Sequence, residues 1–387
     1  EENQTMSSEN KMGVMPINKL ILSMSIPMML SMLIQALYNI VDSMFVAQIS
    51  ENALTAVSLA FPAQNLMIAV ATGTGVGINA TLSRSLGEKN FQKANRIAIH
   101  ALFLAFMSFL AFAVFGLFFA EHFFLAQTRD PEIVEMGTAY LQICTVLSFG
   151  LFGEIAFERL MQSTGRTFYS MIIQGTGAIL NIVLDPVFIF ALHMGVAGAA
   201  VATVLSQMAS CAFVLSFLFG KKVPVKISFG GYDRKLIQRI LLVGFTPFII
   251  IAVDNVMIIS MNSVLQTYGG PGEGDMLITC ATIVQSFMLV ITMPLGGITG
   301  GTQTILAFNY GAGQPDRVKK AQRFIFLLSA GYTTILFILA QTAGHIFVRL
   351  FTSDPALIAE AAKTIKIYTL AVIPLSIQYV ILSLIHI

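Results

Sequence analysis

The sequence has few charged residues and no tryptophan. Only 11% of its 387 residues are charged, whereas 56% are hydrophobic and the mean hydropathy is +0.79. A soluble domain carries about 25% charged residues, so this chain cannot cover a globular surface with polar groups. Phenylalanine (31 residues), methionine (20) and glycine (30) are abundant instead. The composition excludes an ordinary soluble protein and indicates one that is solvated by lipid.

Cysteine and histidine are scarce as well, with three and five residues. Cys144, Cys211 and Cys280 lie in apolar runs far apart, and the histidines are scattered. No pair has the spacing of metal ligands or of a nucleophile with its base. The sequence therefore predicts neither an enzyme nor a cofactor-binding protein.

Ten apolar segments are long enough to cross a membrane, which takes about 20 mostly apolar residues. They cover residues 20–46, 54–82, 96–120, 137–162, 168–192, 196–219, 238–265, 277–308, 322–348 and 362–386. Several contain an internal proline that predicts a kink, because proline removes a backbone hydrogen bond; among them are Pro27, Pro62, Pro247, Pro294 and Pro374. The fold class expected is an all-α polytopic membrane protein.

The basic residues indicate how these segments are oriented. With the N-terminus in the cytoplasm, 18 of the 22 lysines and arginines fall on the cytoplasmic side. The four outside are Arg129, Arg349, Lys363 and Lys366. Cytoplasmic loops of membrane proteins carry an excess of Lys and Arg, so the sequence predicts a cytoplasmic N-terminus. No basic residue lies near the middle of a predicted span.

The sequence repeats itself at an offset of 224 residues, and a repeat of this kind indicates that the fold is built from two similar units. The run 87–93 matches 311–317, and Asp130-Pro131 matches Asp354-Pro355. The other matches are Gly73 with Gly297, Gly77 with Gly301 and, at an offset of 220, Pro27 with Pro247. An even number of helices in each copy relates the copies by an axis along the membrane normal.

The repeat predicts two lobes. We expect a cytoplasmic N-terminal segment at 1–19, an N-lobe of six spans at 20–219, a basic cytoplasmic linker at 220–237 and a C-lobe at 238–387. The C-lobe holds only spans 7–10. A complete second copy needs two more, so we expect the last two helices to lie beyond the end of this chain.

Five acidic residues lie inside predicted spans, where ionisable groups are costly and mark functional sites. They are Asp42, Glu154, Glu158, Asp185 and Asp254. Gln174, Asn181 and Asp185 share one face of the fifth span, and Gln35, Tyr38, Asn39 and Asp42 form a polar stripe on the first.

Two interpretations of Asp42 and Asp185 remain open. If the two face each other, a proton or a cation must lie between them, because two carboxylates repel, and oxygen ligands suit a hard cation. Alternatively, hydrogen bonds between helices satisfy both. Glu154 is a candidate for substrate or proton binding, whereas Glu158 either joins it or pairs with Arg159 or Arg166. Asp254 is a candidate counterpart in the second lobe.

Several short motifs, taken together and in order, resemble the multidrug and toxic compound extrusion (MATE) exporters, in particular the bacterial branch that includes DinF and MepA. They are Ser25-Ile26-Pro27-Met28, Tyr38-Asn39-Ile40-Val41-Asp42, Gln162-Ser163-Thr164-Gly165-Arg166-Thr167, Asn181-Ile182-Val183-Leu184-Asp185-Pro186 and Asn309-Tyr310-Gly311. They run along the whole chain.

The resemblance implies twelve helices in two six-helix lobes around a central cavity, in the bacterial cytoplasmic membrane. It implies a monomer that exports cationic, often aromatic drugs or toxins by antiport against Na⁺ or H⁺, without a cofactor and without a nucleic-acid partner. The cation or proton site that it implies consists of Asp42, Asn181, Asp185 and Thr203. We expect the substrate cavity to include Gln35, Tyr38, Asn39, Glu154, Gln174 and Asp254.

The nearest rival is a flippase for lipid-linked sugars from the same superfamily. Its phosphate-bearing substrates call for arginine or lysine in the cavity, whereas the spans here hold acids. A channel fits less well, because a repeat with kinked helices and buried acids is typical of alternating access. A membrane enzyme needs a nucleophile with a base or a metal cluster, and neither pattern occurs.

Overall fold

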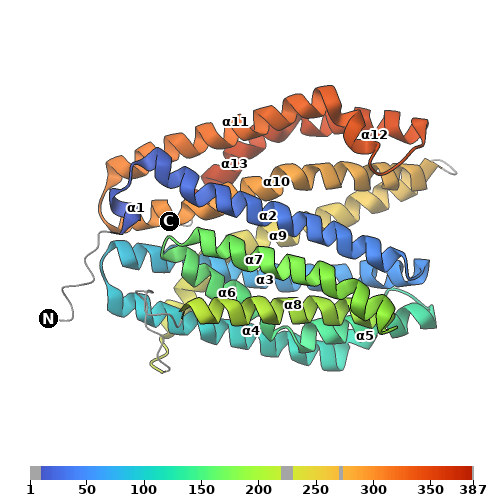
Figure 1. The fold of residues 1–387 in the computed structure, drawn as a ribbon, viewed down its shortest axis with the longest axis horizontal. Helices are drawn as coiled ribbons and strands as arrows, with labels where there is room; N and C mark the ends of the chain where they lie inside the picture. The colour runs from blue at the N-terminus through green and yellow to red at the C-terminus, as the bar shows by residue number, and fades with distance from the viewer. Residues whose placement is uncertain (1–9, 219–229, 270–272, 386–387) are drawn as a thin grey trace.

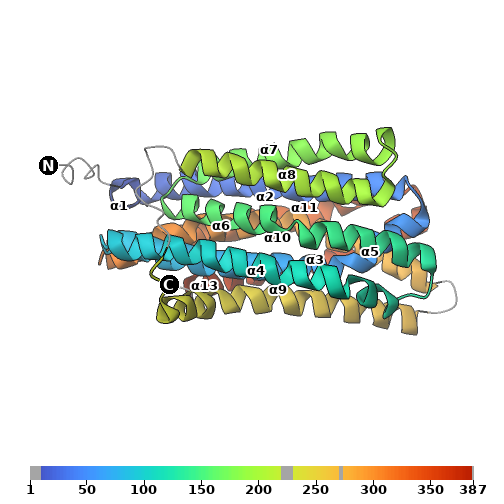
Figure 2. The same ribbon diagram turned by 90° about the horizontal axis from the view of Figure 1, so that it is seen from below.

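The computed structural model describes residues 10–218, 230–269 and 273–385. Within these ranges the chain forms α-helices and two short helical segments of other types, and no β-strand. Residues 1–9 of the predicted N-terminal segment and residues 220–229 of the predicted linker lie outside the described residues. Figures 1 and 2 show the long helices packed side by side, with α1 at one end of the bundle.

The helices follow the order expected for two lobes. The N-terminal part consists of α1 (Lys11–Val14), α2 (Ile17–Ala47), α3 (Glu51–Gly87), α4 (Phe91–Leu125), α5 (Pro131–Val146), α6 (Phe149–Ser163), α7 (Thr167–Pro186), the π-helix η1 (Val187–Ala191) and α8 (Gly195–Leu218). The C-terminal part consists of α9 (Arg234–Tyr268), α10 (Glu273–Gly311), α11 (Pro315–Val348), α12 (Pro355–Tyr368), the 3-10 helix η2 (Thr369–Ala371) and α13 (Val372–Ile385). We call α2–α8 the N-lobe and α9–α13 the C-lobe.

The predicted spans are found. In the described chain nine helical stretches are long and apolar enough to cross a membrane, and the bent pair α5 and α6 makes a tenth if it counts as one span. The predicted span 137–162 differs, since it bends by 42° where α5 gives way to α6. The hydroxyl of Thr145, near the end of α5, donates to the carbonyl oxygen of Leu141 at 2.7 Å. Such back-bonding often bends helices.

The predicted prolines affect their helices differently. Pro27, Pro62, Pro247 and Pro294 lie within α2, α3, α9 and α10, each of which continues as an α-helix on both sides. At Pro374 the helix is divided, because the 3-10 helix η2 separates α12 from α13 just before this residue. Pro374 cannot donate to the carbonyl of Leu370, which lies within η2.

The 224-residue offset recurs in the local geometry. Gly87 and Gly311 end α3 and α10, and the turns that follow contain Lys89 and Gly313 with φ values of 56° and 67°. The next N-caps also correspond. Asp130 and Asp354 each accept a hydrogen bond at 3.0 Å from the backbone nitrogen of the residue two positions later. The two copies therefore share turns and caps as well as sequence.

The lobes touch through glycines near the end of the bundle that holds α1, which we call the α1 end. A Cβ atom on Gly77 of α3 would overlap the carbonyl oxygen of Ile240 on α9. On Gly301 of α10 it would lie 2.8 Å from the carbonyl oxygen of Met24 on α2. Backbone approach of this kind requires glycine. Gly73, Gly87, Gly297 and Gly311 make similar contacts with the other lobe.

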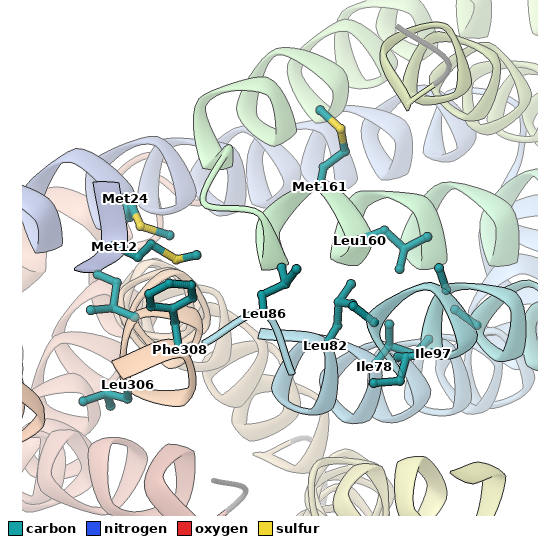
Figure 3. Close-up of a cluster of buried hydrophobic side chains, with 14 of the residues drawn as sticks. Met12, Met24, Ile78, Leu82, Leu86, Ile97, Leu160, Met161, Leu306 and Phe308 are labelled. Atoms are coloured by element: carbon teal, nitrogen blue, oxygen red, sulfur yellow. The ribbon is translucent and has the colours of Figure 1, made fainter. Parts of the chain in front are cut away.

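Polar and apolar side chains close the same interface. Asn79 Oδ1 on α3 accepts a hydrogen bond from the Thr304 hydroxyl on α10 at 3.0 Å, and the Arg84 guanidinium lies 5.0 Å from the centre of the Tyr310 ring. A cluster of buried apolar side chains surrounds them and joins the lobes, including Met12, Met24, Leu82, Leu86, Leu306 and Phe308 (Figure 3). From this end α2 and α10 diverge along the bundle (Figure 1).

The segment around α1 is tied to the C-lobe. Arg317 Nη2 on α11 donates to the carbonyl oxygens of Met12 and Met15 at 3.0 and 2.9 Å, and Asn309 Nδ2 donates to that of Met12 at 3.0 Å. Met12 is fully buried. Lys11 is half-buried, and burial, together with the charge of Arg166, lowers its pKa. The segment thus bridges the lobes at the α1 end.

Replacing Arg317 with glutamine is expected to release this segment. Hydrogen bonds to a charged donor contribute about 1.5–3 kcal/mol, so amide hydrogen exchange of residues 12–15 should accelerate by about 10- to 100-fold. Hydrogen-exchange mass spectrometry measures it. The matched control is Lys319→Gln, an exposed cation two residues along α11, and equal exchange in both variants would contradict the role of Arg317.

Candidate functional site in the N-lobe

Two carboxyl groups from different helices meet inside the N-lobe. Asp42 on α2 and Asp185 on α7 have their side chains within hydrogen-bonding distance of each other. Asp185 is fully buried, and its Oδ2 atom accepts a hydrogen bond from Asn181 Nδ2 at 3.0 Å. Asn181 lies one turn earlier on the same helix. The structure therefore brings three of the four predicted ion-binding residues together.

The oxygen atoms of this cluster indicate what it can bind. Oδ1 of Asp42, Oδ1 of Asn181 and Oδ1 of Asp185 are buried without a hydrogen-bond donor among the described residues. Buried polar atoms nearly always have a hydrogen-bond partner. Hydrogen bonds between the described helices do not provide one for these three oxygen atoms. Adjacent carboxylates also repel unless a positive charge neutralises them. A donor set made of oxygen alone fits a hard cation or a proton.

The backbone around Asp185 departs from regular α-helix. Pro186 follows it and cannot donate a backbone hydrogen bond, and the chain then continues as the π-helix η1. Gly198 of α8 packs directly on the carbonyl group of Phe188 in η1. Short π segments at helix ends or within helices are frequent at functional sites.

Thr203, the fourth predicted ligand, does not join the cluster by hydrogen bonding. It is half-buried on α8, and it makes no hydrogen bond within the described part of the chain. Its assignment came from the resemblance alone, and its role stays a prediction.

A second polar group lies next to the carboxylates. Tyr38 on α2 is close enough to interact electrostatically with Asp42, Asp185 and Glu154. Tyr140 of α5 lies near Asp42 and Tyr38, and its hydroxyl accepts a hydrogen bond from Gln64 of α3 at 3.0 Å. Neither Tyr140 nor Gln64 was predicted. Each is an uncharged polar residue inside an apolar span, which is a weaker signal than a carboxylate.

A family profile described as MatE matches residues 27–187 and 249–385, most of the chain. The chain belongs to the MatE family. It is a MATE transporter of the MepA-like branch, not an enzyme, as the motifs predicted.

Curated relatives and solved structures agree with this membership. The multidrug export protein MepA of Staphylococcus haemolyticus is 24% identical over 354 residues, 91% of this chain and 77% of its own length. MepA of Staphylococcus aureus strain N315 is 23% identical, with the same coverage.

Two solved structures share the fold. A multidrug resistance MATE transporter of the MOP superfamily, in an outward-facing conformation, matches with a TM-score of 0.90 and 23% identity, over 97% of this chain and 84% of that one. A MOP superfamily transporter from Pyrococcus furiosus, for which reverse polarity of the binding pocket was taken to suggest a different function, gives 0.91 and 24%, over 98% and 84%. These likenesses confirm the predicted all-α fold of two lobes.

This MATE transporter holds a second buried carboxylate nearer the α1 end. Glu158 on α6 accepts hydrogen bonds from Gln162 Nε2 at 2.8 Å and from Gln174 Nε2 on α7 at 2.9 Å. Ser31 of α2 donates in turn to Gln174 Oε1. Gln174, which was predicted to share the face of Asp185 and to line the substrate cavity, donates hydrogen bonds to Glu158. Its contact with a substrate stays a prediction.

Arg159 lies near the end of its span, as expected, but its side chain is buried in the interior of the protein. The residue lies one turn before the end of α6, yet its side chain is only 8% exposed and lies against Gly75 of α3 and near Gly300 of α10. Its Nη1 atom donates to Gln162 Oε1 at 2.8 Å, and Gln162 donates to Glu158. Glu158 and Arg159 are therefore connected through an amide.

The remaining predicted cavity residues differ in how exposed their side chains are. Glu154 is half-buried on α6, with the Ser210 hydroxyl of α8 within hydrogen-bonding reach. Gln35 is half-buried and Asn39 exposed on α2, whereas Asp254 is exposed on α9, near Tyr379 of α13. Their contact with a substrate stays a prediction.

Proposed function

We propose that this MATE transporter is a secondary active multidrug exporter that exchanges cationic and aromatic compounds for Na⁺ or H⁺. The observation that carries the proposal is the meeting of Asp42 and Asp185 beside Asn181, with three buried oxygen atoms that have no described donor. Such a cluster gains stability by loading a cation or a proton. An exporter driven by an ion gradient requires a group of this kind.

The proposed orientation places the α1 end in the cytoplasm of a bacterium. The turns at this end carry the basic residues, and cytoplasmic loops are rich in Lys and Arg. In the described structure the lobes touch at this end through the glycines of α3 and α10. In the proposed orientation the closed side is the cytoplasmic one, and the coupling ion enters from outside. We propose a monomer as the working unit.

The proposed cycle needs no covalent chemistry. Na⁺ or H⁺ from outside neutralises Asp42 and Asp185, which weakens the attraction of the N-lobe for a bound cationic drug. After the drug leaves, the lobes separate at the α1 end, and the coupling ion is exchanged for the next drug. A ligand drives such a change only through different affinities for the two states.

The proposed recognition of substrates combines charge with loose apolar contacts. Tyr38 adjoins the carboxylate pair, and Glu154 lies within electrostatic range of Tyr38. Acidic groups select cations. Aromatic faces attract cations as well, and methionine adapts its shape to varied partners. Asp254 is proposed as an acidic contact from the C-lobe.

Transport in proteoliposomes tests the function. The full chain is reconstituted, and efflux of a fluorescent cationic dye is recorded under an imposed Na⁺ gradient and, separately, under a pH gradient. Efflux driven by either gradient is the expected result, and the gradient that drives it identifies the coupling ion. Protein-free liposomes are the control. If neither gradient drives dye efflux, the exporter proposal fails, and translocation of a lipid-linked sugar becomes the reaction to assay.

A further inference from the structure

A basic groove lies between the two lobes at the α1 end. It has a volume of about 430 Å³ and is formed by the start of α4 and the start of α9, which run along one edge of the bundle (Figure 2). Its lining residues are Asn90, Gln92, Lys93, Arg96, Asp233, Lys235, Leu236 and Arg239. Ligand sites commonly occupy about 300–1,000 Å³, so the groove can hold a headgroup-sized ligand.

The cations of this groove outnumber its acids. Lys93 forms an ion pair with Glu88 at 3.4 Å. Arg96, Lys235 and Arg239 have no ion-pair partner within residues 10–218, 230–269 and 273–385. The one carboxylate in the lining, Asp233, accepts a hydrogen bond from the backbone nitrogen of Lys235 at 2.9 Å and caps α9. The groove thus presents three cations without an ion-pair partner beside a single carboxylate.

The internal repeat provides a comparison for these cations. Lys93 corresponds to Arg317 at the offset of 224, and Arg317 is bound by the carbonyl oxygens of Met12 and Met15. At that junction the segment around α1 supplies the acceptors. At the junction of α4 with α9, the described chain offers no such acceptors to Arg96 or to Arg239. The groove therefore has cationic donors that no described acceptor occupies and that are available to an anionic ligand.

The position of the groove indicates the source of the anion. Beyond Arg239, the next turns of α9 expose Leu242 and Phe245 by 74% and 57%, and Phe91 at the start of α4 is 44% exposed. An apolar surface thus continues from the charged groove into the membrane region, where acyl chains lie. Basic pockets between membrane helices bind anionic headgroups. We propose that the groove binds the phosphate-bearing headgroup of an anionic phospholipid in the leaflet at the α1 end.

A lipid in this position links the two lobes. Lys93 and Arg96 belong to the N-lobe, and Lys235 and Arg239 belong to the C-lobe. One headgroup between them adds contacts that exist only while the α1 end is closed. Bound lipid therefore favours the closed conformation of this end.

Lipid binding to the purified full chain tests the proposal. Native mass spectrometry measures the binding of phosphatidylglycerol and of phosphatidylcholine to the wild type and to the double variant Arg96→Gln/Arg239→Gln. Each cation near a membrane surface contributes about fivefold to the binding of an anionic headgroup (about 1 kcal/mol). The double variant should bind phosphatidylglycerol about 30-fold more weakly, and its phosphatidylcholine binding should not change.

The internal repeat also supplies the matched control. Lys320 and Lys19 are the counterparts of Arg96 and Arg239 at offsets of 224 and 220, and both are exposed. Lys19→Gln/Lys320→Gln removes the same charge and should bind phosphatidylglycerol as the wild type does. The single variant Lys235→Gln, at an exposed position, provides a second test with an expected loss of about fivefold.

Three results would overturn the assignment. The first is equal binding of phosphatidylglycerol and phosphatidylcholine by the wild type. The second is an equal loss of binding in the groove variant and in its control, which would reflect net charge only. The third is displacement of phosphatidylglycerol by inorganic phosphate at matched concentration, which would identify the site as one for free phosphate. None of these results depends on the coupling ion or on drug transport.

Discussion

Replacing Asp185 with asparagine is expected to abolish ion-coupled efflux while leaving the fold intact. Asparagine has the shape of aspartate, its amide oxygen can still accept the hydrogen bond from Asn181, and its amide nitrogen can donate to Asp42. The buried position thus stays packed and hydrogen-bonded. What the variant loses is one of the two negative charges that hold the coupling ion.

The size of the effect follows from electrostatics. A unit charge about 4 Å from a cation, at an effective dielectric constant of about 20, contributes about 4 kcal/mol. Its removal lowers the affinity for the ion by about three orders of magnitude. A transporter that does not load its coupling ion at the available concentration loses the driving force for efflux.

The measurement compares wild type and Asp185→Asn in the same proteoliposome assay, under the gradient that drives the wild type. Asp316→Asn is the matched control, because it removes the same charge in the first turn of α11, away from the N-lobe interior. Binding of the coupling ion is measured in parallel by isothermal titration calorimetry. An Asp185→Asn protein that still responds to the gradient as the wild type does would remove this cluster from the coupling mechanism.

The carboxylates of this site could be found from the sequence, because charge inside a span is a strong signal. Asp42 and Asp185 stand out for that reason, and Asn181 follows from its spacing on the same helix. Tyr140 and Gln64 could not be found in the same way. Their polarity is compatible with an apolar span. The packing of α5 against α3 brings Gln64 to Tyr140, and Tyr140 lies near Asp42.

Helical spacing was less reliable for Gln174 and Arg159. Gln174 lies on the face of α7 that carries Asp185, but three turns away, where it meets Glu158 on α6. The long side chain of Arg159 extends from near the end of α6 into the interface between the lobes. The position of a residue along its span does not show how far such a side chain reaches. Both depend on which helices neighbour each other, and hydropathy does not provide that information.

The spans themselves were predictable, because lipid exposure requires long apolar helices. The short helix α1 was not, since four residues carry no periodicity. Its position depends on carbonyl groups bound by Arg317, a contact across almost the whole chain. The bend where α5 gives way to α6 was missed as well, because hydropathy does not report bends.

Adding one methyl group at Gly77 is expected to open the α1 end. The Cβ atom of Gly77→Ala would overlap the carbonyl oxygen of Ile240 and would lie 3.2 Å from Cγ2 of the same residue. Because the first of these neighbours is backbone, no rotamer change relieves the overlap, and α3 and α9 must separate. Overpacking costs about 1–3 kcal/mol, which lowers the ratio of closed to open molecules by about 5- to 150-fold.

Gly296→Ala is the matched control for this variant. It lies inside α10, and no heavy atom lies within 4 Å of the Cβ that the substitution adds. Both substitutions raise helix propensity by about 1 kcal/mol, so a difference between them reports the contact between lobes. Gly301→Ala, the repeat counterpart of Gly77, should open the same end by a smaller amount, since its Cβ would lie 2.8 Å from the carbonyl oxygen of Met24.

Spin labels on Lys89 and Lys319, which are exposed at the α1 end on different lobes, report the separation through electron–electron distance measurements. Gly77→Ala should shift the distribution to longer distances, Gly301→Ala should shift it less, and Gly296→Ala should match the wild type. If Gly77→Ala and Gly296→Ala give the same distribution, the glycine contacts do not hold this end closed. The order of the distance shifts in the three variants thus tests whether Gly77 and Gly301 act as paired contact points. A general loss of stability would not rank the variants by how closely each added Cβ atom approaches the other lobe.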